Sequence, residues 1–117
     1  MSNPFQEKHS FEDRTKESEK IINKYPDRIP IIVTKNKSCI LNDIPKCKFL
    51  VPKDLTMAQF TVIVRKRISL TDKETLFLFI NDQTLATGSE SVSNLYDQHK
   101  DEDGFLYISY CNENVFG

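Results

Sequence analysis

The sequence predicts a single α+β domain in which one long helix packs across a four-stranded mixed sheet, preceded by two additional helices. Segments of helical and strand character follow one another in the order helix, helix, strand, strand, helix, strand, helix, strand. Residues 76–80 are apolar on both faces, as in a central strand covered above and below. A chain of 117 residues has room for one hydrophobic core, so we expect one compact domain.

The start of the chain predicts a short helix over residues 4–8 and a longer one over residues 11–24. Ser10 precedes Asp13 by three residues, which is typical of a helix N-cap. Pro26 ends the second helix, because proline disfavours helical geometry in the residue before it and donates no backbone hydrogen bond.

A hairpin follows the helices. β-Branched side chains predict a first strand over residues 29–33, and Pro30 within it indicates an edge strand or a special local geometry. Residues 34–46 are polar and predict a turn, after which residues 48–51 predict the second strand.

Thr56 and Gln59 match a capping box, and apolar residues at helical spacing then predict a helix over residues 57–68. The remaining segments are a strand at 76–80, a loop at 81–90, a short helix at 92–96 and a last strand at 105–110. Two strands, a helix, a strand, a short helix and a strand is the β-grasp order. The all-apolar strand also needs cover on its second face, and the two N-terminal helices can supply it in a helix/sheet/helix sandwich.

Composition excludes several classes of protein. The chain is 38% hydrophobic and 28% charged, which is typical of a globular domain, and its longest apolar run is far shorter than the roughly 20 residues that cross a bilayer. Cys39, Cys47 and Cys111 have no C-x-x-C spacing, so we expect reduced cysteines in a cytosolic protein and no metal site.

Charge is distributed unevenly along the chain. Residues 31–75 carry nine Lys and Arg against four Asp and Glu, whereas residues 76–117 carry one against seven. This asymmetry predicts either a solvated surface with internal salt bridges or a basic face for acidic partners. The chain is nearly neutral overall and carries no recognised nucleic-acid module, so we expect no nucleic-acid partner.

Several long motifs occur in a specific order. They are KYPDRIP at 24–30, KFLVP at 48–52 with DLT at 54–56, QF at 59–60, RKR at 65–67, DEDGFLY at 101–107 and the closing FG at 116–117. Over essentially its whole length the chain resembles the autophagy ubiquitin-like modifier family, which includes the GABA-receptor-associated protein and the microtubule-associated light chain. The loop at 81–90 is one residue longer than is common there, and Cys47 stands where a basic residue is frequent.

The resemblance implies a ubiquitin-like β-grasp protein that is not itself an enzyme. Activating and transfer enzymes would join Gly117 to phosphatidylethanolamine on autophagic membranes, in autophagosome formation, and a cysteine protease would process or release it. The lipid is a covalent anchor and no other cofactor is implied. The protein would be a cytoplasmic monomer, and autophagosomal when lipidated. Its single domain would comprise a helical extension (1–25), a β-grasp core (26–110) and a conjugation tail (111–117).

The resemblance also implies that cargo receptors and adaptors bind through aromatic-x-x-aliphatic motifs at the strand 48–51. The pocket for the aromatic residue would be lined by Glu17, Ile21, Pro30, Ile32, Lys48, Leu50 and Phe105. The pocket for the aliphatic residue would be lined by Phe49, Val51, Pro52, Leu55, Phe60 and Ile63. Acidic residues beside the motif would meet Arg28, Lys46, Lys48 and Arg67.

Other interpretations of these residues stay open. Phe60, Ile63, Phe79 and Leu106 also fit plain core positions, and the basic run at 65–67 fits a solvated helix end. Cys47 or Cys111 paired with His9 or His99 would be the candidate catalytic pair, but no local signature surrounds any of these residues. A β-grasp module that binds partners without being conjugated would use the same pockets.

Overall fold

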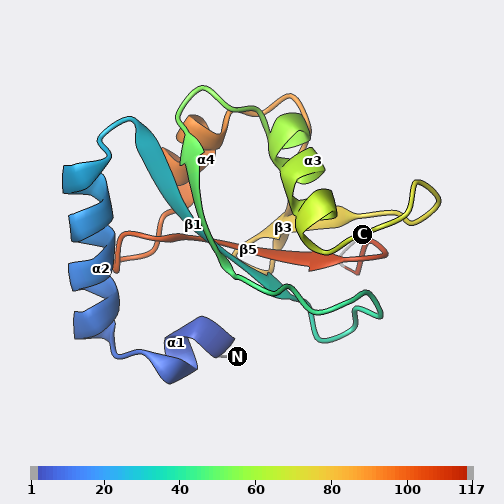
Figure 1. The fold of residues 1–117 in the computed structure, drawn as a ribbon, viewed down its shortest axis with the longest axis horizontal. Helices are drawn as coiled ribbons and strands as arrows, with labels where there is room; N and C mark the ends of the chain where they lie inside the picture. Colours follow the sequence, from blue (N-terminus) through green and yellow to red (C-terminus); the bar gives the residue numbers. More distant parts are fainter. Residues whose placement is uncertain (1–2, 116–117) are drawn as a thin grey trace.

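The computed structural model describes residues 3–115, which form nine helices and strands in one domain (Figure 1). The helices are α1 (Pro4–Lys8), α2 (Phe11–Lys24), α3 (Met57–Arg67) and α4 (Val92–His99). The strands are β1 (Arg28–Lys35), β2 (Lys48–Pro52), β3 (Phe77–Ile80), β4 (Thr84–Leu85) and β5 (Leu106–Cys111). None of the helices among these residues is long and apolar enough to cross a bilayer.

The sheet has the strand order β2-β1-β5-β3-β4. Strands β1 and β2 form the predicted antiparallel hairpin, while β1 and β5 run parallel, so the sheet is mixed as predicted. The central strand is β5, whose six residues are all buried, and not β3 as the apolar pattern suggested. The apolar pattern predicted burial correctly, because Leu78, Phe79 and Ile80 of β3 are buried. Periodicity carries no information on the order of strands in a sheet.

A fifth strand corrects the predicted four-stranded sheet. β4 pairs antiparallel with β3 inside the segment that we predicted to be a loop. Asn81 and Asp82 have φ angles of 52° and 57°, and the Gln83 N–H donates to the Ile80 carbonyl at 3.0 Å. Asn and Asp tolerate this left-handed geometry and favour hairpin turns. The strand escaped prediction because its two residues are both exposed and show no alternation.

Pro30 does not mark an edge, because β1 lies between β2 and β5. Its cross-strand partner in β2 is Leu50, and the pairing with β5 begins one residue later at Ile31. Proline is therefore tolerated here because it precedes the start of the parallel ladder, which is the special local geometry that we had predicted as the alternative.

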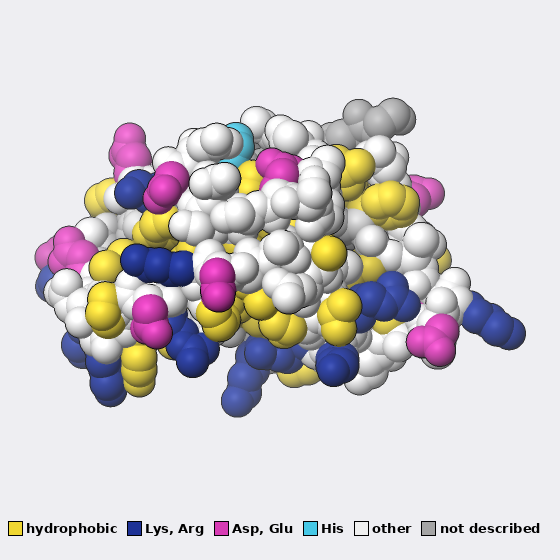
Figure 2. Space-filling model, turned by 90° about the horizontal axis from the view of Figure 1, so that it is seen from above, with side chains coloured by type: hydrophobic (Ala, Val, Ile, Leu, Met, Phe, Trp, Pro, Cys, Tyr) yellow, Lys and Arg dark blue, Asp and Glu magenta, His cyan; other side chains and the backbone are white. Residues whose placement is uncertain are grey.

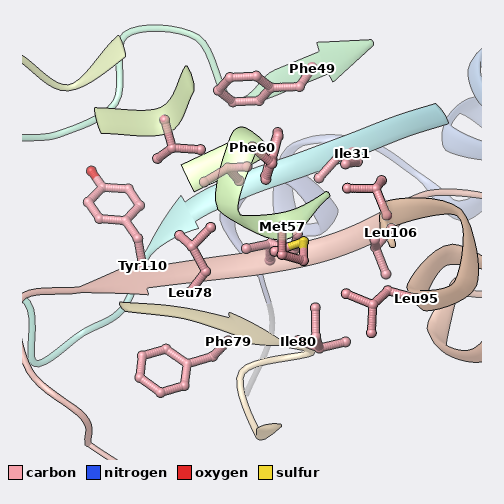
Figure 3. Packing of buried hydrophobic residues seen from close by; sticks show 14 of the residues in the cluster. Ile31, Phe49, Met57, Phe60, Leu78, Phe79, Ile80, Leu95, Leu106 and Tyr110 are labelled. Carbon is pink, nitrogen blue, oxygen red and sulfur yellow. The ribbon is translucent and has the colours of Figure 1, made fainter. Parts of the chain in front are cut away.

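The main core lies between the sheet and the two helices α3 and α4, which cover one face (Figures 1 and 3). Thr56 and Gln59 form the predicted capping box, so α3 begins where the sequence indicated. Met57, Phe60 and Val64 then recur on one side of α3 and are each at most 1% exposed. Their helical spacing is what directs α3 onto the sheet.

A second, smaller core lies on the opposite face. It consists of Phe5, Ile32, Phe105 and Tyr107, with the half-buried Ile21 and Cys47 packed against it. The two N-terminal helices supply this layer, and the Ser10 side chain caps α2 through the Asp13 N–H at 3.1 Å. The helix/sheet/helix arrangement is therefore present, although α2 packs mainly against β1.

Candidate functional site

Strand β2 forms an edge of the sheet, with β1 as its single strand neighbour among the described residues. The Val33 N–H donates to the Cys47 carbonyl at 2.8 Å, which marks Cys47 as bonded to β1. Residues bonded to the partner alternate along an antiparallel pair. The backbone N–H and C=O groups of Lys48 and Leu50 therefore point away from the sheet.

Two arginine side chains bind carbonyl groups along this edge. Arg28 Nη1 donates to the Leu50 carbonyl at 3.4 Å, and Arg67 Nη1 donates to the Lys46 carbonyl at 3.0 Å. Unpaired edge groups are a template for an added strand, and side chains that cover them limit unwanted pairing. The predicted flank residues Arg28, Lys46 and Arg67 are thus all located at the β2 edge.

The predicted aromatic pocket falls on the face of the sheet that α2 covers. Ile32 and Phe105 are fully buried in the second core, and Ile21 packs against it from α2. Pro30 is also buried and lies opposite the half-buried Leu50. At the rim, Lys48 Nζ and a Glu17 carboxylate oxygen form an ion pair that joins β2 to α2.

The predicted aliphatic pocket falls on the opposite face, beside α3. Phe49 and Val51 are 3% and 4% exposed, and Phe60 is fully buried with its ring edge-to-face against Phe49 at 5.4 Å (Figure 3). Leu55 and Ile63 are half-buried against the same core, whereas Pro52 is exposed. Arg67 places its guanidinium carbon 4.0 Å from the centroid of Phe49, so it covers that ring from solvent.

Two surface hollows on α2 border the aromatic set. One, of about 520 Å³, is lined by residues from Lys20 to Tyr25 and includes Ile21; the other, of about 490 Å³, includes Glu17. The first is lined by α2 and by Tyr25, which follows it, and the second by residues of α2. Ile32 and Phe105 lie deeper and are covered by neighbouring side chains. The side chains at the surface of the aromatic set must therefore move before an aromatic residue of a partner can contact them.

Figure 2 shows Lys and Arg side chains gathered along one rim of the face that it displays, next to apolar side chains. The arrangement suits an extended, partly acidic, partly apolar segment better than a small molecule.

Comparison with known proteins decides the family. The family profile described as "Autophagy protein Atg8 ubiquitin like" matches residues 13–117. The chain belongs to this family. It is 48% identical over 117 residues to Autophagy-related protein 8 of Mycosarcoma maydis and 46% identical to that of Aspergillus niger, in each case over 100% of this chain and 98% of the relative. A crystal structure of ATG8 from Trypanosoma brucei superposes with a TM-score of 0.92 at 39% identity and full coverage of both chains.

The chain is thus an autophagy ubiquitin-like protein with the ubiquitin-like fold that its motifs predicted.

In this Atg8-family member, α2 is held to the sheet by a buried polar cluster that sequence analysis missed. Arg14 Nε lies 2.8 Å from Asp103 Oδ2, and the Tyr107 hydroxyl donates to the same oxygen. Asp103 is fully buried, and its hydrogen bond raises the pKa of Arg14. Burial, followed by the bond to Asp103, raises the pKa of Tyr107.

Gly104, which follows Asp103, allows this close approach of α2. Its φ is 93°, and a Cβ at this position would lie 2.4 Å from Ser18 Oγ, so a larger residue would push α2 away. The Asp-Gly pair in residues 101–107 signals a turn in the sequence. It does not reveal that the partner of the turn is Arg14, because the two lie 89 residues apart.

In the structure, the side chains of the cysteine–histidine alternative have other neighbours. Cys111 is fully buried, and Cys47 is half-buried against the second core. The His9 ring packs against Phe5 with a centroid separation of 4.6 Å. Gly117, the predicted conjugation residue, lies outside the described residues.

Proposed function

We propose that this Atg8-family chain is conjugated through Gly117 to phosphatidylethanolamine and recruits cargo receptors and adaptors by adding their aromatic-x-x-aliphatic segments to the β2 edge. The observation that carries the binding role is the edge itself. Its outward Lys48 and Leu50 backbone groups are flanked by apolar residues on both faces of the sheet.

An added strand would pair its backbone with that of β2. The guanidinium groups of Arg28 and Arg67 occupy the Leu50 and Lys46 carbonyls, so they must swing aside first. Once displaced, they lie beside the incoming strand and can pair with its acidic residues. Lys48 gains the same freedom when its ion pair with Glu17 opens.

The proposed mode of binding accounts for the two residues between the anchors. Successive side chains of an extended segment point to opposite faces, so residues at positions i and i+3, with two residues between them, also face opposite ways. The aromatic set around Ile32 and Leu50 lies on the α2 face, and the aliphatic set around Val51 and Leu55 lies on the α3 face. A segment on the β2 edge therefore reaches both sets only when the positions of its two anchors differ by an odd number.

The conjugating role rests on membership of the family and on the match of the family profile through residue 117. A carboxylate does not react with an amine until it is activated. Partner enzymes would use ATP to form an acyl adenylate, transfer the acyl group to their cysteines, and release the thiol when the lipid amine attacks. This chain is the acyl donor in each step and supplies no catalytic group. A partner cysteine protease would cut the resulting amide.

Conjugation converts a cytoplasmic protein into one held on autophagosomal membranes. A single acyl chain gives marginal membrane binding, whereas two chains give stable anchoring, and phosphatidylethanolamine carries two. Adding the lipid to the tail leaves the β2 edge available for receptors. The two roles together would place receptors, and the cargo they carry, at the membrane.

A reconstituted conjugation reaction tests the proposal. The family's activating and transfer enzymes, ATP and phosphatidylethanolamine vesicles are incubated with the full chain or with a chain that lacks Gly117, and products are weighed by mass spectrometry. We expect a lipid adduct on the full chain alone. No adduct on either chain, with enzymes active on another family member, would favour the unconjugated binding module.

A further inference from the structure

Ile40 is the most exposed large hydrophobic residue among those that the structure describes. Its exposed fraction is 84%, whereas its neighbours Cys39 and Leu41 are 9% and 7% exposed. The loop between β1 and β2 thus turns two side chains into the core and presents the one between them to solvent.

The loop is held in this arrangement by contacts on both sides of Ile40. The Cys39 N–H donates to the Asn36 carbonyl at 3.0 Å, and the Tyr110 hydroxyl donates to the Asn42 carbonyl. Leu41 is part of the main core. Because its neighbours are fixed, Ile40 cannot fold inwards without breaking buried contacts, and it stands as a rigid apolar projection.

Ile40 is hydrogen-bonded to the residue that follows β5, where the C-terminal tail begins. The Ile40 N–H donates to Asn112 Oδ1 at 3.2 Å. Gly117 follows five residues later, and five residues extend at most about 18 Å. Figure 1 shows this loop and the C-terminal end of β5 at one end of the molecule, with α2 at the other.

We propose that Ile40 inserts into the lipid bilayer to which Gly117 is attached and so orients the domain on the membrane. The inference rests on the conjugation proposed above. A lone side chain is far too small for a stable protein interface, which buries about 1,200–2,000 Å² in total. A tethered chain meets the bilayer at high effective concentration, so one apolar residue is sufficient to bias its orientation.

The surroundings of Ile40 also suit a bilayer surface. Lys37 is exposed on the same loop, where its ammonium group can stay at the level of the headgroups while Ile40 enters the acyl region. In this orientation α2, at the opposite end of the molecule, faces away from the membrane (Figure 1). The rim of the aromatic set on α2 then stays open to cytoplasmic partners.

Tryptophan fluorescence tests this orientation, because the chain contains no tryptophan. The variant Ile40→Trp provides a single probe on the loop, and Ile22→Trp, on the outward part of α2, provides the matched control. Each full chain carries a hexahistidine tag after Gly117 and is tethered to phosphatidylcholine and phosphatidylethanolamine vesicles that contain a nickel-chelating lipid. Circular dichroism first checks that both variants fold like the parent chain.

We expect Ile40→Trp to shift to shorter emission wavelength on tethering and to lose intensity when the vesicles contain lipids with brominated acyl chains. Ile22→Trp should show neither change. Equal responses from the two probes, or no response from Ile40→Trp, would overturn the proposal. A blue shift without vesicles that grows with protein concentration would assign Ile40 to a contact with a second copy instead. The tag replaces enzymatic conjugation, so these outcomes are independent of whether Gly117 accepts a lipid.

Discussion

Arg14 and Asp103 form an ion pair that joins α2 to the turn before β5, with 2.8 Å between Arg14 Nε and Asp103 Oδ2. Their side chains are 11% and 0% exposed, in contrast to the Lys16–Glu12 pair, whose side chains are 70% and 79% exposed. Buried pairs of this kind are costly to break, because one partner is left without compensation. The pair therefore holds α2 against the turn before β5.

Asp103→Asn should destabilise the chain by about 2–4 kcal/mol, because it leaves the Arg14 guanidinium and the Tyr107 hydroxyl with a weaker partner in a buried place. Urea denaturation followed by far-UV circular dichroism measures the change. Glu12→Gln, which removes the exposed pair with Lys16, should leave the midpoint unchanged. Equal midpoints for the two variants would show that the buried pair does not stabilise α2.

Alkaline pH should destabilise the fold through Tyr107 and Tyr110. Burial raises the pKa of both hydroxyls in the folded state above their ordinary value of 10.0. Between the ordinary and the raised pKa only the unfolded state releases these two protons, so the contribution of each tyrosine to stability is constant below about pH 10 and falls above it. Each tyrosine contributes a slope of up to about 1.4 kcal/mol per pH unit.

Tyrosinate absorbance and circular dichroism, recorded together from pH 8 upwards, check this behaviour. The buried tyrosines should ionise only as the fold is lost. Ionisation of all four tyrosines near pH 10 with an unchanged circular dichroism spectrum would contradict the burial argument.

Leu50→Ala should weaken binding of an aromatic-x-x-aliphatic peptide by about tenfold, because Leu50 is the outward, half-buried residue of β2 on the α2 face. Titration calorimetry measures the affinity. Leu85→Ala is the matched control, since Leu85 is also partly exposed but belongs to β4 at the opposite edge of the sheet. Should both variants bind like the parent chain, the β2 edge would lose its assignment.

Thr56→Ala should cost about 1 kcal/mol, because it removes the side chain that accepts the Gln59 N–H at the start of α3. Thermal unfolding measures the loss. In a Gln59→Ala background the same substitution should cost less, since the reciprocal half of the capping box is already absent. Additive effects of the two substitutions would argue against the box as a unit.

The parts of the fold that could be predicted from sequence are those fixed by neighbouring residues. Ser10 with Asp13 and Thr56 with Gln59 mark helix starts through contacts three residues apart, and both starts agree with the structure. Segments 4–8 and 11–24 likewise match α1 and α2. Local hydrogen bonds and local periodicity are present in the sequence itself, so such features are readable.

The parts that could not be predicted depend on residues far apart in the chain. The central place of β5 is set by its pairing with β1 and β3, and Arg14 finds Asp103 across 89 residues. The candidate site was predictable only as a set of residues in matching motifs. That Leu50 and Val51 serve opposite faces follows from strand alternation, but that one face carries α2 and the other α3 required the structure.

Titration of two matched peptides tests the binding proposal most directly, because the apolar sets lie on opposite faces of the β2 edge. One peptide carries an aromatic and an aliphatic anchor with two residues between them, and the other is identical except that one intervening residue is deleted. Deletion turns both anchors to the same face, so we expect the shorter peptide to bind at least about tenfold more weakly. Equal affinity for the two peptides would contradict binding by strand addition at β2.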